Sequence, residues 1–573
     1  MILQALTSYY RRISVDSEQD IAPEGFQKKE IPFVIVLDHE GFFKGLLDTR
    51  EGEGKNKRAR SFTVPREIKR SGKNSWETAN LLWDNEGYVL GFSNQDKEKA
   101  KKQHKSFIAK IRGHFPDPVT DEGVSSILKF LERGDFSAVI TSPTWAEVEK
   151  KGGNLSFMLE GDIGLVSQRV KVINAINAAQ HEDDNVLRQQ CMVTGELDSP
   201  VRLHASIKGV WGAQTAGANI VSFNLPAFSS YGKEQGYNAP VGKKAEFAYT
   251  TALNTMLSKG SHQRIQVGDA STVFWAEHEN PIEDAFYNLF GMSAENSEQD
   301  YEAIKALYKA PITGAPPLDD EDLTPFYVLG LSPNAARISV RFWYAGTVGD
   351  ARKNITLHFE DCSMVHGKNQ PSHLKLLRLL CSTALQGKVE NVQPNLAGDF
   401  MKAILGGTLY PQTLLSSAIR RARAERDVTY PRAALIKGVL AREKRFYHTE
   451  EKELNMSLDQ TNMNTGYLLG RLFAVLERAQ EFANPGINAT IRDRFYGAAS
   501  STPVTVFPHL LKLKNHHIAK LESKGLAVNL EKLTGEIMIG LNEFPAHLKL
   551  QDQGRFAVGY YHQRQDFFTK KES

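Results

Sequence analysis

GYLLGRLFAVLERAQEF, residues 466–482, decides the fold of the last third of the chain. Its apolar residues recur every three or four positions, so one helical stripe holds Leu468, Leu469, Leu472, Phe473, Leu476 and Ala479. Helical patterns also occupy residues 412–426, 431–446, 508–523, 530–541 and 553–569, and Pro431 suits a first helical turn. Since the connections are short, we predict a C-terminal α-helical bundle domain over residues 401–573.

Strand patterns dominate nearer the N-terminus, after a first amphipathic helix within residues 1–13. The run IPFVIVL at 31–37 and the return at 42–47 predict a β-hairpin. Residues 81–83 and 88–92 predict a second hairpin, and residues 97–112 a basic helix. Strict alternation at 336–344 predicts a strand with Ile338, Val340, Phe342 and Tyr344 on one face. The fold class is therefore α+β, with a large mixed α/β region, residues 1–400, before the bundle.

Bulk composition is that of an ordinary soluble globular protein. The 573 residues are 41% hydrophobic and carry a formal net charge of +3. The sequence has no apolar run of transmembrane length and no secretory signal, so we expect no membrane partner. Cys191, Cys362 and Cys381 form no Cys-x-x-Cys pair, which argues against a disulfide framework or a zinc knuckle. A reducing cytoplasm is the simplest location.

Basic residues gather in three runs, within 55–73, 97–112 and 420–445. Any single run is more often a solvated surface face, but three runs favour contact with phosphates. The first run begins rich in glycine and lysine, so we predict a loop there that an anionic partner orders.

Residues 206–254 are rich in glycine, amides and aromatics, which is unusual for a core segment or a linker. Glycines permit close approach to another chain, and amides supply donors and acceptors that suit base edges and phosphates. This segment therefore predicts an ordered, ligand-facing surface, with nucleic acid as the partner that suits it best.

Motifs for catalysis are missing from the sequence. The closest approach to a phosphate-binding loop, GYNAPVGKK at 236–244, has the wrong spacing, and no dinucleotide-binding or His-Asp motif occurs. Cys191 has no histidine at a readable spacing, which favours a buried structural cysteine. We predict a protein that is not an enzyme and has no cofactor and no bound metal.

Several separated blocks resemble one known family, the Csd-type large subunit of the type I-C CRISPR Cascade. They occur in the same order from end to end: MILQALTSYY (1–10), RSGKNSWETANLLWDNEGYVLG (70–91), CMVTGE (191–196), the segment 206–254, ARISVRFWY (336–344), GTLYPQTLLSSAIRRARAE (407–425), TGYLLGRLFAVLERAQ (465–480) and GYYHQRQDFF (559–568).

The resemblance implies a non-catalytic subunit of an RNA-guided surveillance complex in antiviral defence. Such a subunit recognises the protospacer-adjacent motif (PAM) in duplex DNA, aids unwinding and R-loop formation, guides the displaced single strand and recruits the helicase–nuclease. Its implied partners are the guide crRNA, double-stranded target DNA, and the backbone, guide 5′-end and small subunits of Cascade. It also implies a separately translated small subunit that starts near Met456 or Met463, although ordinary methionines remain the alternative at both positions.

On this basis we expect PAM contacts from Lys73, Asn74, Lys208, Trp211, Gln214, Asn219, Ser222 and Asn224, because amides pair well with adenine edges. The alternative for any one amide is that it caps a turn, and for Trp211 that it anchors the loop by packing. Contacts to the nucleic-acid backbone are expected from Lys55, Lys57, Arg58, Arg60, Arg420, Arg421 and Arg423.

Two other functions stay open at this point. One is a metal-dependent nuclease whose site is too scattered in sequence to read. The other is a purely structural scaffold that contacts only protein subunits.

Overall fold

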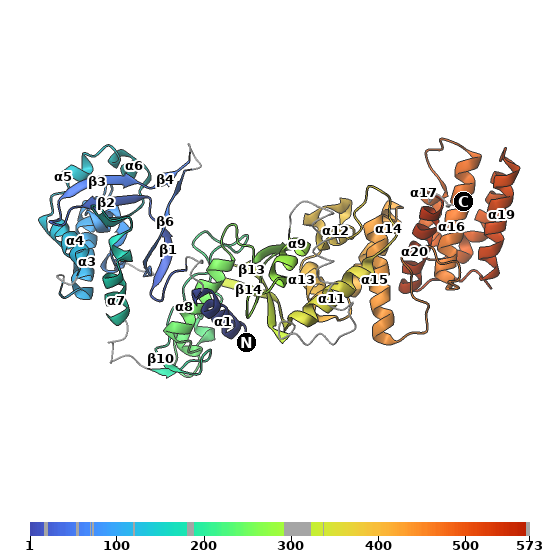
Figure 1. Cartoon of the computed structure of the whole chain (residues 1–573). Helices are drawn as coiled ribbons and strands as arrows, with labels where there is room; N and C mark the ends of the chain where they lie inside the picture. Colours follow the sequence, from blue (N-terminus) through green and yellow to red (C-terminus); the bar gives the residue numbers. More distant parts are fainter. Residues whose placement is uncertain are drawn as a thin grey trace. The chain divides into compact units, whose positions relative to one another are not determined.

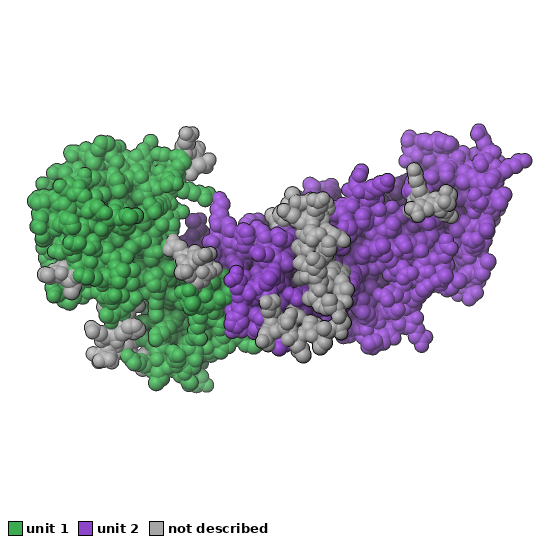
Figure 2. All heavy atoms as spheres, viewed as in Figure 1, with its two compact units in different colours: residues 1, 3–205, 222–252 green, residues 2, 206–221, 253–573 purple. Residues whose placement is uncertain are grey.

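The computed structural model describes residues 1–15, 21–52, 57–68, 70, 74–117, 121–179, 188–291, 323–335 and 337–568. Figure 1 shows the elements, and Figure 2 colours two compact units. The first unit has residues 1, 3–205 and 222–252, and the second has residues 2, 206–221 and 253–573. Strands lie in both units, and the sequence beyond the last strand is helical, so the predicted α+β class is confirmed. The functional boundary at residue 400 stays a prediction.

A four-stranded sheet organises the first unit. Its order is β3 (Phe43–Asp48), β2 (Phe33–Leu37), β8 (Asn154–Leu159) and β7 (Trp83–Asn85). The predicted hairpin of β2 and β3 is confirmed, and β2 also pairs in parallel with β8. Both faces of β2 are buried, which explains its uninterrupted apolar sequence.

Helices cover one face of this sheet and a β-ribbon covers the other. Phe33 and Ile35 share a core with residues of α3 (Lys97–His114) and α4 (Glu122–Arg133). Val34 instead packs with Phe62 and Val64 of β6 (Ser61–Pro65), which pairs with β1 (Phe26–Glu30). The short helices α5 (Ser137–Ile140), α6 (Trp145–Lys151) and α7 (Val170–Ala179) complete this part of the unit.

Two predictions for this unit are wrong. Residues 86–89 form helix α2 (Glu86–Val89) in place of a hairpin strand, because the Asn85 side chain accepts hydrogen bonds from the N–H groups of Gly87 and Tyr88. Residues 58–65 are not a loop, since β5 (Arg58–Ala59) pairs with β4 (Arg50–Glu51) and β6 follows. Residues 55, 56, 69 and 71–73 lie outside the described residues.

The first unit also contains the predicted N-terminal helix, α1 (Ile2–Val15), whose Tyr10 packs edge-to-face on Phe247 of α8 (Lys243–Met256). Before α8 the chain is mostly irregular, with the short strands β9 (Gln189–Gln190) and β10 (Leu197–Asp198) and the 3₁₀ turns η5 (Pro226–Phe228) and η6 (Gln235–Asn238). This irregular segment carries most of the exposed aromatic and amide residues of the predicted ligand-facing surface.

The second unit begins with an antiparallel sheet in the order β11 (Arg264–Val267), β12 (Ala270–Ala276), β13 (Pro325–Asn334) and β14 (Arg337–Thr347). The predicted strand is confirmed as β14, but its strict alternation is not. A bulge shifts the register so that Leu331 pairs with Val340 and Gly330 with Phe342, and Val340 is 42% exposed whereas Phe342 is buried. The extra residue turns the two side chains to opposite faces of the sheet.

Helices predominate in the other described residues of the second unit. They are α9 (Ile282–Phe290), α11 (Val348–Cys362), α12 (Leu376–Cys381), α13 (Leu396–Gly406), α14 (Gln412–Glu425), α15 (Tyr430–Tyr447), α16 (Thr465–Ala483), α17 (Ile491–Ala499), α18 (Phe507–Ala519), α19 (Lys524–Ile539) and α20 (Leu550–Asp566). All six helices predicted beyond residue 401 are confirmed. One hydrophobic core runs from Ile265 of β11 to Tyr561 of α20. Every described helix is too short or too polar to span a lipid bilayer.

Candidate nucleic-acid interface

Asn74 stands beside an aromatic and a basic side chain in the first unit. It is exposed and precedes the 3₁₀ turn η2 (Ser75–Glu77), where its carbonyl accepts a hydrogen bond from the Glu77 N–H at 3.0 Å. The Lys102 ammonium of α3 lies 5.6 Å from the centre of the Trp76 ring. The Tyr88 hydroxyl donates to the Ser75 carbonyl at 2.8 Å, which fixes the turn against α2. Asn74 is therefore held at the edge of a basic helix.

Helix α3 has one buried and one strongly basic face. Phe107 and Ile111 are buried in the core of the unit. The exposed face carries Lys97, Lys99, Lys101, Lys102 and Lys105. The sequence shows this basic run, but only the contact between Lys102 and Trp76 places it next to Asn74. In the sequence, the four-residue spacing of Phe107 and Ile111 was the signal that one face of this helix is buried and the lysines lie on the other.

Three of the predicted backbone contacts form a second basic group. Lys57, Arg58 and Arg60 are all exposed, and the Arg60 guanidinium lies 5.3 Å from the centre of the Phe62 ring. Nearby Arg50 is instead bound to Asp48 and Glu147, and Arg66 is bound to Glu246 by both of its terminal nitrogens. Exposure therefore separates cations available to phosphates from cations that hold the fold.

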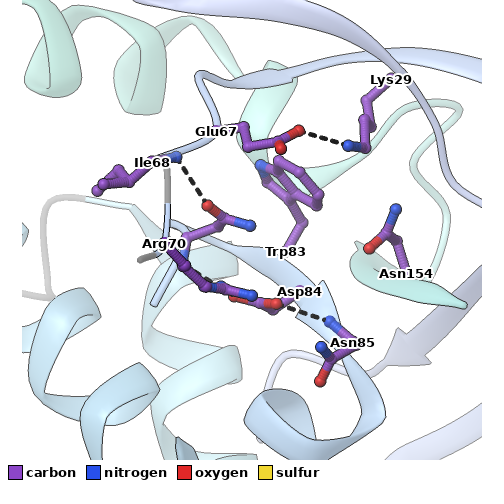
Figure 3. A pocket seen from close by; sticks show the side chains of 9 residues that line it. Lys29, Glu67, Ile68, Arg70, Trp83, Asp84, Asn85 and Asn154 are labelled. Carbon is purple, nitrogen blue, oxygen red and sulfur yellow. Dashed lines mark hydrogen bonds and ion pairs between the residues drawn. The ribbon is translucent and has the colours of Figure 1, made fainter. Parts of the chain in front are cut away.

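The first unit also has a polar pocket of about 270 Å³. In the view of Figure 3, the ion pair of Lys29 with Glu67 lies above the Trp83 indole and that of Arg70 with Asp84 below it. Burial raises the pKa of Asp84, although Arg70 and backbone N–H groups donate to it. Because each cation is paired with a carboxylate, the pocket suits a neutral polar group better than a phosphate. The other lining residues are Ile68, Asn80, Asn85 and Asn154.

In the second unit, Lys208, Trp211 and Gln214 belong to one closed loop, and Asn219 directly follows it. Ile207 and Ala218 exchange both backbone hydrogen bonds across its base, at 2.8 and 2.9 Å. Gly217 is required there, because its φ is +84° and a Cβ would lie 2.6 Å from the Ile207 carbonyl oxygen. Lys208 and Gln214 are exposed, Asn219 is half-buried, and Ile338 of β14 donates to the Asn219 carbonyl.

Trp211 is not a packed anchor of this loop. Its backbone N–H donates to the Ser271 hydroxyl at 2.9 Å, but the side chain is 62% exposed. The ring is thus presented at the surface of the second unit, where it is available to a partner.

The remaining predicted PAM residues lie elsewhere. Ser222 is half-buried and Asn224 exposed in the first unit, whereas Lys73 lies outside the described residues, as does Lys55 of the predicted backbone contacts. Two other amides of the segment do hold turns. The Asn254 amide accepts from the Lys208 N–H and donates to the Ser206 carbonyl, and Asn238 bonds both ends of a neighbouring turn.

The arginines of α14 form a separate group in the second unit. Arg420 and Arg423 are exposed, and their guanidinium groups donate to Ser417 and Ser501. Arg421 is half-buried and lies 3.9 Å from Glu425. Further along the same basic run, Arg432, Lys437 and Arg442 are buried and bond to carbonyls or carboxylates, so they serve the fold.

Cys191 and His358 are held in structural contacts. Within the described ranges, no three His, Cys, Asp or Glu side chains converge in a way that could hold a metal ion. Burial favours a higher pKa for the Cys191 thiol, but hydrogen bonds from Gly242, Thr194 and Val193 together outweigh it and the pKa is lowered. His358 is fully buried beside the Tyr410 hydroxyl, and burial lowers its pKa to about 3.

Comparison with known proteins identifies the family. No match is found among curated proteins. The sequence model of the family described as CRISPR-associated protein (Cas_Csd1) matches residues 6–568, which is nearly the whole chain. The match includes both compact units and all the described basic groups above. The chain therefore belongs to the Cas_Csd1 family of CRISPR-associated proteins.

Proposed function

We propose that this protein is the non-catalytic large subunit of a type I-C Cascade, which recognises the PAM in duplex DNA. In this proposal it aids unwinding and R-loop formation, guides the displaced strand and recruits the helicase–nuclease. Its partners are the guide crRNA, target DNA, and the backbone, guide 5′-end and small subunits. The family membership supports a role in a CRISPR complex.

One observation carries the DNA-binding part of the proposal. Asn74 is exposed next to Trp76 and the basic face of α3, in the same unit as Lys57, Arg58 and Arg60. Exposed cations bind phosphates without regard to sequence, whereas an exposed amide can pair with an adenine edge. The same unit therefore has residues for both parts of motif recognition.

The test measures binding of the assembled complex to target duplexes with randomised flanking motifs. Replacing Lys57, Arg58 and Arg60 by Glu should weaken binding to every motif alike. It should also reduce the slope of log affinity against log salt by about 3, because roughly one unit is lost per phosphate contact. Asn74→Ala should instead relax the preference at one motif position, by about 1–3 kcal/mol.

The matched control reverses three exposed lysines, which gives the same change in net charge: Lys512 of α18, Lys520 directly after α18, and Lys524 of α19. It should keep wild-type affinity and salt slope. If reversal at 57, 58 and 60 leaves DNA binding unchanged, the scaffold alternative is favoured. Unchanged motif preference in both Asn74→Ala and Asn219→Ala would remove these residues as readers. Metal-dependent cleavage by the purified chain, abolished by one carboxylate substitution, would establish the nuclease alternative.

A further inference from the structure

Tyr231 occupies an unusual position in the first unit. Its side chain is 98% exposed, and its backbone is left-handed, with φ of +51°. Gly232 follows with φ of +69°, and the Lys233 N–H donates to the Ser230 carbonyl at 3.0 Å. Two positive φ values in succession define a type I′ turn, in which Asn, Asp or Gly is the usual first central residue. A tyrosine there is strained, and its exposed ring adds little packing to offset the strain.

The surrounding loop holds this strained turn in place. The Asn238 side chain accepts from the Ser230 N–H at 2.8 Å and donates to the Lys233 and Gln235 carbonyls, each at 3.0 Å. One amide thus ties both ends of the turn together. Strain of this kind persists only where neighbouring contacts determine the backbone, and such places are commonly ligand contacts.

The base of the loop is fixed as firmly. The Gly236 N–H donates to the Arg202 carbonyl at 3.0 Å, and a Cβ on Gly236 would lie 2.2 Å from the Val201 carbonyl oxygen. The Arg202 guanidinium donates to the Gln235 side chain at 2.6 Å. Because the chain is bonded on both sides of the turn, the Tyr231 ring is presented on a preorganised support.

The chemistry around the ring indicates its partner. Lys233 is exposed two residues beyond Tyr231 and is followed by one exposed carboxylate, Glu234. Arg202 is exposed at the base of the loop, and Ser229 and Ser230 add small polar groups. A flat aromatic face with cations beside it is the arrangement by which proteins bind unpaired nucleotides, since the ring stacks on a base and the cations contact the phosphates.

We propose that the turn Ser230–Lys233 presents Tyr231 as a stacking platform for an unpaired base of single-stranded nucleic acid. Lys233 contacts the adjacent phosphate, and Asn238 acts as a positioning residue that keeps the ring in place. The inference rests on the proposed function, because R-loop formation supplies single strands. It concerns a loop different from the Asn74 surface proposed to read duplex DNA.

The experiment uses the full chain and a labelled single strand of about 12 nucleotides with one 5-iodouracil, as DNA and as RNA. Tyr231→Ala should weaken binding about 5- to 100-fold, the range for the loss of one stacked base. Tyr231→Phe keeps the ring and should bind like the wild type. Irradiation should crosslink the iodinated base to residue 231 in the wild type and in Tyr231→Phe.

Two more variants separate binding from folding. Tyr231→Gly relieves the left-handed strain, so it should unfold at the wild-type temperature or higher and still lose binding. Asn238→Ala should lower the crosslinking yield at Tyr231, and its effect on affinity should be much smaller when Tyr231 is already alanine.

The outcomes that overturn the inference are distinct from those that overturn the proposed function. If Tyr231→Ala binds the strand as the wild type does and no crosslink maps to 231, stacking is overturned while DNA recognition through Asn74 stands. If Tyr231→Ala impairs only assembly with other subunits, the turn is a protein interface and the inference is wrong. A wild-type chain and complex that bind no nucleic acid overturn both.

Discussion

His562 shows how a single buried residue links folding to pH. It is fully buried on α20, with Nδ1 3.0 Å from the Tyr467 hydroxyl of α16. That hydroxyl accepts from the Asp459 N–H, so its own proton is available to the imidazole nitrogen. Burial, and to a smaller extent the charge of Lys437, lowers the pKa of His562 to about 4. The neutral imidazole is therefore part of the folded structure at neutral pH.

The pH dependence follows from the sign of this shift. Between pH 6.5 and pH 4 the unfolded chain binds a proton at His562 that the folded chain does not, so the free energy of unfolding falls as the pH drops through 6.5. From pH 7 to pH 5 this residue alone should remove about 2 kcal/mol. Chemical denaturation at the two pH values should show a loss smaller by about that amount in His562→Gln. An equal loss in the variant and the wild type would contradict the assignment.

At the scale of elements, α16 and α20 pack with almost no space between their backbones. A Cβ on Gly470 of α16 would lie 2.0 Å from the Phe556 carbonyl oxygen, and one on Gly559 of α20 would lie 2.2 Å from the Tyr467 carbonyl oxygen. Glycine at these positions lets the two helices approach closely enough for Phe473 to contact Phe556 and Tyr560 across the interface. The close distance between α16 and α20 thus requires glycine at positions 470 and 559.

Gly470→Ala should therefore destabilise the protein, by about 2 kcal/mol or more, because overpacking against backbone outweighs the better helix propensity of alanine. The control is Gly535→Ala in α19, where no atom lies within 4 Å of the new Cβ. That control should be stabilised by roughly 0.5–1 kcal/mol. Denaturant unfolding measures the free energy of unfolding of both variants and of the wild type. A Gly470→Ala variant more stable than the wild type would disprove the close packing.

Elements with long periodic patterns could be predicted from sequence, and short ones could not. Helix α16 has 19 residues, or about five turns, so its apolar period is unmistakable, whereas five residues at 88–92 fit a strand and a helix equally well. Residues 86–89 form a helix because the Asn85 side chain caps its first turn. The bulge in β14 depends on how this strand pairs with β13, and the sequence of β14 alone does not give that pairing.

The candidate interface divides in the same way. Basic residues such as Arg58 and Arg60 are visible as a run, and exposure confirms that they are accessible. The contact of Lys102 with Trp76, two residues after Asn74, joins segments that sequence spacing does not bring together, and the left-handed backbone of Tyr231 has no sequence signal because tyrosine rarely adopts it. Arg432 and Arg442 could not be distinguished as buried, because their carboxylate partners, Glu425 of α14 and Asp361 of α11, come from other helices.

At the scale of the molecule, the C-terminal helices share their core with the rest of the second unit. Gly554 of α20 faces Leu415, Ile436 and Leu440 of α14 and α15, and the Tyr561 hydroxyl donates to the Val365 carbonyl. A separately made C-terminal polypeptide would leave this apolar face of α20 uncovered. We therefore expect such a polypeptide to need a protein partner there for full stability.

The two possible start sites should differ. A polypeptide from Met456 keeps the hydrogen bond from the Asp459 N–H to Tyr467, whereas one from Met463 lacks Asp459 and should be less stable by about 1 kcal/mol. Thermal unfolding of the two purified polypeptides at the same concentration measures the difference. Equal stability, or greater stability of the shorter one, would contradict this reasoning.

The shared core also fixes the order in which the second unit can fold during synthesis. A ribosome makes β11 nearly 300 residues before α20, yet side chains of both belong to the same core. Until α20 has emerged, the apolar residues of α14, α15 and α16 that pack against it stay exposed and are prone to aggregate. The first unit, whose assigned residues all precede position 253, can fold while the second is still being made. Chaperones should therefore be needed mainly for the nascent second unit.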